Sequence, residues 1–160
     1  MMSRYLRAAV LAGFWLLLLS PAAARAEVSP GFFGTWHLNV AASTFPGPTP
    51  YARGRWRIER APDDQVMMIY DLVGTRGGVT HMEWTGRFDG IDYRLQGPDA
   101  VVTYAYYTVD DRTLNVVVKV DGRTTATARV ALTSNGALSV TTEAQTASGM
   151  SQTVSVYEKR

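Results

Sequence analysis

Cysteine is absent from this 160-residue chain, and histidine occurs only twice, as His37 and His81. The lack of cysteine excludes disulfide bonds, a catalytic thiol, iron–sulfur clusters and thiolate metal sites. Two histidines supply few ligands for zinc or non-haem iron. The fold must therefore be stabilised by a hydrophobic core, which a chain of this length can form.

Helical periodicity is also missing after residue 26. Valine, threonine and aromatic residues instead alternate over short runs bounded by glycine, proline, aspartate and asparagine, which is typical of β-strands. Asp121-Gly122 and Asn135-Gly136 favour two-residue hairpins, and a proline-containing loop is expected over 41–51. The strands are predicted at 32–40, 53–60, 65–73, 79–88, 91–96, 101–109, 113–120, 124–132, 137–145 and 152–158.

Consecutive hairpins of this kind predict an all-β, antiparallel up-and-down meander barrel of about 8–10 strands, since a long sheet must close to avoid open edges. A sandwich of two sheets is the alternative. Several strands show which face is inward. Alternation places Leu114, Val116 and Val118 on one inner face, opposite the small residues Ala126 and Ala128, which leaves room on that side of the barrel.

The long apolar run lies at the start of the chain. Arg4 and Arg7 precede the run 8–19, and Ala24-Arg25-Ala26 fits a signal-peptidase site. We therefore expect a signal helix in a cleaved signal peptide over residues 1–26, a single domain over 27–160, and a periplasmic or secreted product with no membrane span after cleavage.

Loss of the signal peptide changes the charge balance. The chain has 16 basic and 14 acidic residues, and Arg4, Arg7 and Arg25 leave with the signal, so 13 basic residues remain against 14 acidic ones. A nearly neutral domain has no overall field to attract polyanions, and we expect neither nucleic acid nor a membrane surface as a partner.

A motif near the predicted new N-terminus resembles a known family. Gly34-Thr35-Trp36 followed by Leu38-Asn39 is similar to the Gly-x-Trp signature of lipocalins, and the terminal Val156-Tyr157-Glu158-Lys159 extends the likeness to small exported bacterial lipocalin-like (calycin-like) proteins of mostly unknown function. The resemblance implies a barrel whose closed end is plugged by Trp36 beneath a basic residue, Lys159 or Arg160. It implies no ligand and no catalytic residue.

Aromatic side chains are concentrated in the central strands. Small-molecule sites are apolar cavities with a few polar groups, and tyrosine supplies both kinds of surface, while methionine adds adaptable surface. These residues either fill the barrel or line a ligand cavity. The candidate ligand-binding residues are Trp56, Met68, Tyr70, Trp84, Tyr104 and Tyr106.

Other chemistry has weaker support. His81 and Glu83 share a strand face, which is better explained as an outer polar face than as a metal site. No nucleophile elbow or phosphate-binding loop occurs, and Asp89 lies in a turn sequence. We predict no metal, no cofactor and no catalytic residue. The arginines at 53, 55 and 57 form a stripe that is expected to face solvent.

Three functions agree with these patterns. The first is an exported barrel that binds a small apolar or amphipathic molecule. The second is a structural or envelope-associated protein with a filled barrel that acts through its surface. The third is a cavity enzyme of the cyclase or isomerase type, which would require histidine or a carboxylate to converge on the interior.

Overall fold

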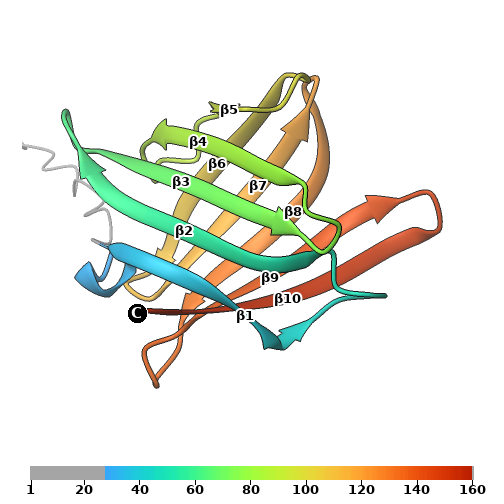
Figure 1. The fold of residues 1–160 in the computed structure, drawn as a ribbon. Coiled ribbons are helices and arrows are strands. Elements are labelled where there is room, and N and C mark those ends of the chain that lie inside the picture. The colour runs from blue at the N-terminus through green and yellow to red at the C-terminus, as the bar shows by residue number, and fades with distance from the viewer. Residues whose placement is uncertain (1–27, 160) are drawn as a thin grey trace, which may run out of the picture.

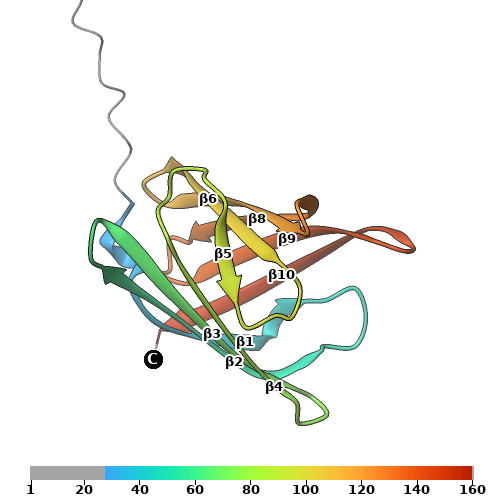
Figure 2. The ribbon, with the colours of Figure 1, turned by 90° about the horizontal axis from the view of Figure 1, so that it is seen from above.

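The computed structural model describes residues 28–159, which form a closed antiparallel barrel of ten strands in the order β1-β10-β9-β8-β7-β6-β5-β4-β3-β2. Strands β2 to β4 form one side, β6 to β9 the opposite side, and β5 joins them (Figure 1 and Figure 2). The strands are β1 (Gly34–Thr44), β2 (Tyr51–Ala61), β3 (Gln65–Gly74), β4 (Val79–Gly86), β5 (Tyr93–Gln96), β6 (Val102–Asp110), β7 (Thr113–Val120), β8 (Arg123–Leu132), β9 (Leu138–Thr146) and β10 (Gly149–Lys159).

The up-and-down barrel predicted from the sequence is confirmed, and the two-sheet sandwich is not formed. The first strand pairs with both β2 and β10, so the described strands leave no unpaired sheet edge. The predicted signal helix and signal peptide, residues 1–26, lie outside the described residues. Within residues 28–159, no helix has the length and apolar character needed to cross a membrane.

Two turns follow the backbone preferences of their sequences. Asp121 and Gly122 both have positive φ, at 49° and 77°, as a type I′ hairpin requires. Asp63 and Asp64 adopt the same region, at 58° and 56°, between β2 and β3. Aspartate tolerates this conformation better than most residues, which explains why these short loops reverse the chain tightly.

The first strand is longer than expected. It continues to Thr44, although 41–51 was predicted as loop, because a bulge after Asn39 is held by side chains. The Ala42 N–H donates to Asn39 Oδ1 at 3.0 Å, and the Val156 N–H donates to Ser43 Oγ at 3.0 Å. These bonds replace regular ladder bonds and keep the strand attached to β10. A short 3-10 helix, Pro30–Phe32, lies immediately before β1.

The hydrophobic core occupies one end of the barrel. This end, which we call the packed end, contains the starts of β1, β3, β7 and β9 and the ends of β2, β4, β8 and β10. Its core consists of buried inward side chains, which include Trp36, Ile58, Val66, Trp84, Leu114, Val116, Val130, Leu132 and Leu138. The alternation predicted for β7 and β8 is confirmed here, and in β6 it is Tyr104 and Tyr106 that face inward while Tyr107 faces solvent.

Candidate functional site

The six aromatic and methionine residues predicted to bind a ligand lie together inside the barrel. Trp56 stacks on Tyr70 with ring centroids 5.3 Å apart, and Trp84 contacts Tyr106 edge to face at 4.7 Å. Tyr104 lies 6.2 Å from Tyr106. The Trp56–Tyr70 contact follows from register, because these two residues are direct partners on β2 and β3, and Met68 is likewise the direct partner of Trp84 on β4.

Hydroxyl groups connect this aromatic cluster across the interior. The hydroxyls of Tyr70 and Tyr106 are 2.7 Å apart, which joins β3 to β6 through a hydrogen bond. The Tyr70 hydroxyl also lies 3.2 Å from Met68 Sδ, and the Trp84 indole N–H donates to the Tyr104 carbonyl at 3.2 Å. The ring polar atoms of Tyr70, Tyr106 and Trp84 are therefore partnered, which allows these rings to lie among apolar side chains.

The six residues divide into two groups by burial. Trp56, Met68, Trp84 and Tyr106 are at most 3% exposed and belong to the core of the packed end. Tyr70 and Tyr104 are only partly buried, and they lie at the level where the inward side chains begin to be accessible to solvent. The structure thus places two of the six at an accessible surface and the other four behind it.

The opposite end of the barrel, which we call the open half, has partly exposed inward side chains. Solvent reaches the inner face of a closed sheet only where the side chains do not fill the interior. These partly exposed residues come from most of the strands around the barrel. They are Leu72, Met82, Val118, Ala126, Ala128, Thr142, Ala144, Ser151, Thr153, Ser155 and Tyr157.

One wall of the open half is built from small side chains. Register aligns Ala126 with Ala144 and Ala128 with Thr142, and the next strand adds Ser151 opposite Ala144. In the closed strand order, this wall on β8, β9 and β10 lies across the interior from β3, which carries Tyr70. A surface of small hydroxyl and methyl groups opposite aromatic rings has the mixed character of small-molecule sites.

Sequence reasoning missed the hydroxyl residues of β9 and β10 and the inward Tyr157. Tyr157 packs edge to face on Trp56 at 5.6 Å. The predicted last strand began at 152, so its alternation was too short to show that 151, 153, 155 and 157 share the inner face. The extended strand, with serine and threonine at alternate positions, contains the signal that identifies them.

Burial keeps the interior tyrosines uncharged. Desolvation raises the pKa of Tyr70 well above its ordinary value and that of Tyr157 to about 12, and nearby tyrosines add to both shifts. Desolvation also raises the pKa of Tyr104 and of Tyr106. These phenols remain hydrogen-bond donors throughout the physiological pH range.

One buried donor in this cluster has no partner among the described residues. The Trp56 indole nitrogen is inaccessible to water and makes no hydrogen bond to any of these residues. Trp56 as a whole is only 3% exposed. Tyr70 and Tyr157, the rings that pack on Trp56, are themselves partly exposed. An unsatisfied donor at such a boundary is unfavourable unless an acceptor reaches it.

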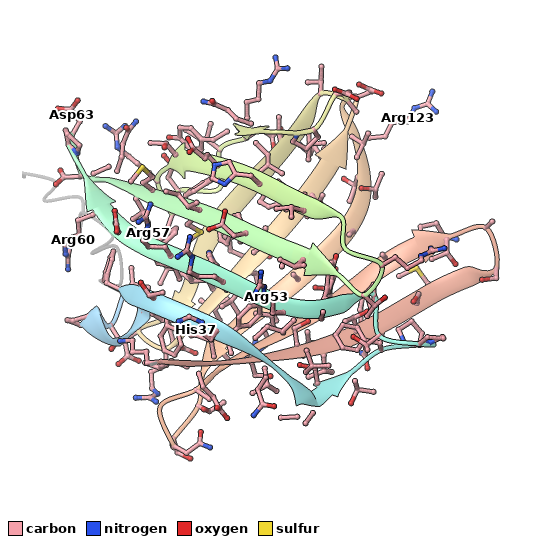
Figure 3. All side chains as sticks on the ribbon, viewed as in Figure 1. His37, Arg53, Arg57, Arg60, Asp63 and Arg123 are labelled. Carbon is pink, nitrogen blue, oxygen red and sulfur yellow. The ribbon has the colours of Figure 1, made fainter. Side chains whose placement is uncertain are left out.

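A network of polar side chains lies on the outer face of β2, β3 and β4. Asp71 accepts hydrogen bonds from Arg55 at 2.7 Å and is 2.6 Å from His81 Nδ1, while His81 Nε2 lies 3.0 Å from Glu83. This exposed network explains the His81 and Glu83 pattern as an outer polar face. Figure 3 shows Arg53 and Arg57 along β2, with His37 on the neighbouring β1.

A hollow of about 740 Å³ lies at the packed end, beside the β2–β3 turn and the segment after β4. None of the six predicted residues lines it, although Phe88 in its wall stacks on Trp84 at 6.3 Å. Its polar groups already serve the fold, since Arg87 donates to the Asp63 carbonyl and Asp89 accepts from Tyr93. We therefore regard the open half of the barrel as the stronger candidate.

Comparison with known proteins supports the fold. No family model and no curated protein matches the chain. Among solved structures, the chain is similar to an asparagine-to-alanine mutant of the fluorescent protein UnaG, with 18% sequence identity and a TM-score of 0.59, over 81% of this chain and 96% of that one. The likeness extends to the fold alone, which in this chain is a closed antiparallel up-and-down barrel of ten strands.

Proposed function

We propose that this protein is an exported barrel that binds a small apolar or amphipathic molecule in its open half. The ligand would lie between the partly exposed rings of Tyr70, Tyr104 and Tyr157 and the wall of small side chains on β8, β9 and β10. Aromatic rings provide apolar contact area, and the hydroxyl groups provide orientation.

The observation that carries this proposal is the contrast between the two ends of the barrel. Trp36, Trp84, Leu114 and Leu138 are 0% exposed at one end, whereas the inward side chains at the other end retain solvent contact. A protein that required only a stable barrel would gain stability by filling both ends. The unfilled half is therefore the part of the interior that is available to a ligand.

The enzymatic alternative receives less support. The inward side chains of the open half, within the described residues, include no histidine and no carboxylate, so an acid–base pair for cyclisation or isomerisation is missing there. Asp92, which could have served as an acid or base, instead forms an outer ion pair with Lys119 at 2.7 Å.

The alternation of β8 provides a matched pair of variants for a binding test. Ala126 faces inward between Val118 and Ala144, whereas Thr127 on the same strand is exposed. Ala126→Trp should fill the open half and remove binding, while Thr127→Trp should leave binding unchanged. The readouts are native mass spectrometry of protein purified from its source and titration with the fluorophore N-phenyl-1-naphthylamine. Circular dichroism confirms that both variants fold.

Two results would contradict the proposal. One is wild-type protein that retains no ligand and does not bind the fluorophore. The other is an Ala126→Trp variant that folds and binds as tightly as the wild type. Export is tested separately, because cleavage after Ala26 predicts Glu27 as the first residue of the mature protein, which N-terminal sequencing of protein from its native host would detect.

A further inference from the structure

Among residues 28–159, no charged side chain lies on the inner face of the open half. Along β2, β7, β8 and β9, the charged residues alternate outward, where they are in contact with solvent or with one another. These outward residues are Arg53, Arg55, Lys119, Arg129 and Glu143. The inward residues between them are glycine, alanine, valine, serine, threonine and aromatic residues, so a ligand in this half would meet no fixed charge.

A buried ionic group needs a partner of opposite charge. Transfer of a carboxylate or sulfonate from water to an apolar interior is strongly unfavourable when no cation or dense set of donors compensates it. Two basic residues, Arg60 and Lys159, occupy inward positions of their strands, but both lie at the packed end. There Arg60 stacks on the Phe33 ring at 4.4 Å, and Lys159 lies over the Trp36 ring at 4.7 Å. They are separated from the open half by the core.

The interior does contain donors for a neutral acceptor. The Trp56 N–H has no partner among the described residues, and the rings that pack on Trp56, those of Tyr70 and Tyr157, border the open half. Each such hydrogen bond to a carbonyl or ether oxygen strengthens binding and satisfies a donor that is otherwise unpaired.

We propose that the ligand is an uncharged molecule with a hydrogen-bond acceptor, to which the Trp56 indole N–H donates. Compact anionic ligands are excluded from the open half. This inference rests on the proposed function and specifies the chemical class of its ligand. It distinguishes the barrel from one that anchors a carboxylate or phosphate by an internal cation.

Two fluorophores that differ by one charged group test the exclusion of anions. N-phenyl-1-naphthylamine is neutral, and 1-anilinonaphthalene-8-sulfonate has the same ring system with an added sulfonate. The neutral probe should bind at least about tenfold more tightly, because the sulfonate has no internal cation. If the sulfonate binds as tightly as the neutral probe, and competes with it, the exclusion of anions is wrong although the barrel still binds ligands.

A lysine placed on the inner wall should weaken this preference. Thr142 faces inward opposite Ala128 and Thr153, and Thr141 is its outward neighbour on β9. Thr142→Lys should reduce the difference in affinity between the two probes by about tenfold, whereas Thr141→Lys should leave it unchanged. An equal effect of both substitutions would indicate that the probes bind to the outer surface, which would overturn the assignment.

The role of Trp56 is tested with a neutral probe that carries a carbonyl. Trp56→Phe keeps an aromatic ring and removes the N–H. It should weaken the binding of Nile red by about five- to tenfold, which is the usual effect of one hydrogen bond, and should leave N-phenyl-1-naphthylamine within about twofold. Equal weakening of both probes would overturn the hydrogen bond and assign Trp56 a packing role. Failure of every probe to bind would contradict the proposed function itself.

Discussion

Trp36 closes the packed end of the barrel and is held there by two contacts. Its ring is 0% exposed, its indole N–H donates to the Phe32 carbonyl at 2.8 Å, and Lys159 Nζ lies 4.7 Å from the ring centroid. The same Lys159 amine donates to the Gly31 carbonyl at 2.8 Å, which holds the 3-10 helix over the barrel end. The expectation that a late basic residue covers Trp36 is confirmed for Lys159.

Trp36→Ala should therefore be among the most destabilising single substitutions in the chain. Removal of a fully buried tryptophan leaves a large cavity and typically costs about 3–5 kcal/mol. Lys159→Ala removes an exposed cation–π contact, for which about 0.5–1 kcal/mol is expected. Urea unfolding followed by circular dichroism measures both. Comparable midpoints for the two variants would show that Trp36 does not support the core.

The outer network around His81 predicts a pH dependence. The hydrogen bond that His81 donates to Asp71, and then the one that it donates to Glu83, raise the pKa of His81. The bond from His81, followed by the bond from Arg55, lowers the pKa of Asp71. The His81 contribution to stability is lost as the pH rises through its raised pKa, and the Asp71 contribution is lost as the pH falls through its lowered pKa. Both are present between about pH 4 and 6.5.

Asp71→Asn should move the His81 pKa back toward its ordinary value, because it removes the largest cause of the shift. The effect on stability should be small, since both side chains are substantially exposed. NMR titration of the His81 ring protons gives the pKa directly, and His37 serves as an internal reference. A His81 titration that is identical in wild type and variant would refute the ion pair in solution.

Sequence patterns located the aromatic cluster but not the division within it. Tyr70 and Tyr106 could be assigned to the interior from residue type and strand position. Their different exposures depend on which neighbours fill the adjacent space, and those neighbours, such as Leu114 and Ser155, belong to strands far away in the chain. Single-strand alternation contains no information about packing across a barrel.

Among the strands, β5 is the shortest, and its pairing with β4 consists of Glu83–Gln96 and Trp84–Leu95. Gly97 follows it with φ of 117°, and a Cβ atom there would lie 2.5 Å from the His81 carbonyl oxygen. Only glycine allows the chain to pass this close to β4 in that conformation. The junction between β4 and β5 is therefore the least extensively paired seam in the described barrel.

Hydrogen–deuterium exchange should reveal this seam. Amides of β5 should exchange faster than those of β2 and β3, which share a ladder along nearly their full lengths. Peptides that cover 91–98 and 65–74 provide the comparison by mass spectrometry. Equal protection of the two peptides would mean that side-chain packing, with Trp84 5.9 Å from Tyr93, compensates for the short ladder.

All ten strands were predicted from turn residues and alternation, and most of the differences concern their ends. The exceptions have physical causes that local sequence does not show. The β1 extension depends on a bulge held by Ser43 and by Val156, a residue more than one hundred positions away. Closure of the barrel depends on pairing between the first and last strands, for example between Trp36 and Lys159, and no local pattern specifies this pairing.

At the scale of the whole molecule, stability and ligand binding are assigned to opposite ends of one barrel. Leu138→Ala, at a site that is 0% exposed, should cost about 2–5 kcal/mol of unfolding free energy. Val118→Ala, at a partly exposed inward site of the open half, should cost much less. Urea denaturation of both variants provides the test, and similar losses would show that the interior is packed uniformly.

The half-filled interior also affects how such a protein can change over generations. Substitutions at Ala128, Thr142 or Thr153 alter the shape and polarity of the inner wall without opening a gap in the core around Trp36 and Leu138. Because most mutations are rejected through lost stability, positions that do not contribute to stability are the ones free to vary. Descendants of this barrel could therefore acquire new ligands one residue at a time while their folded scaffold remains intact.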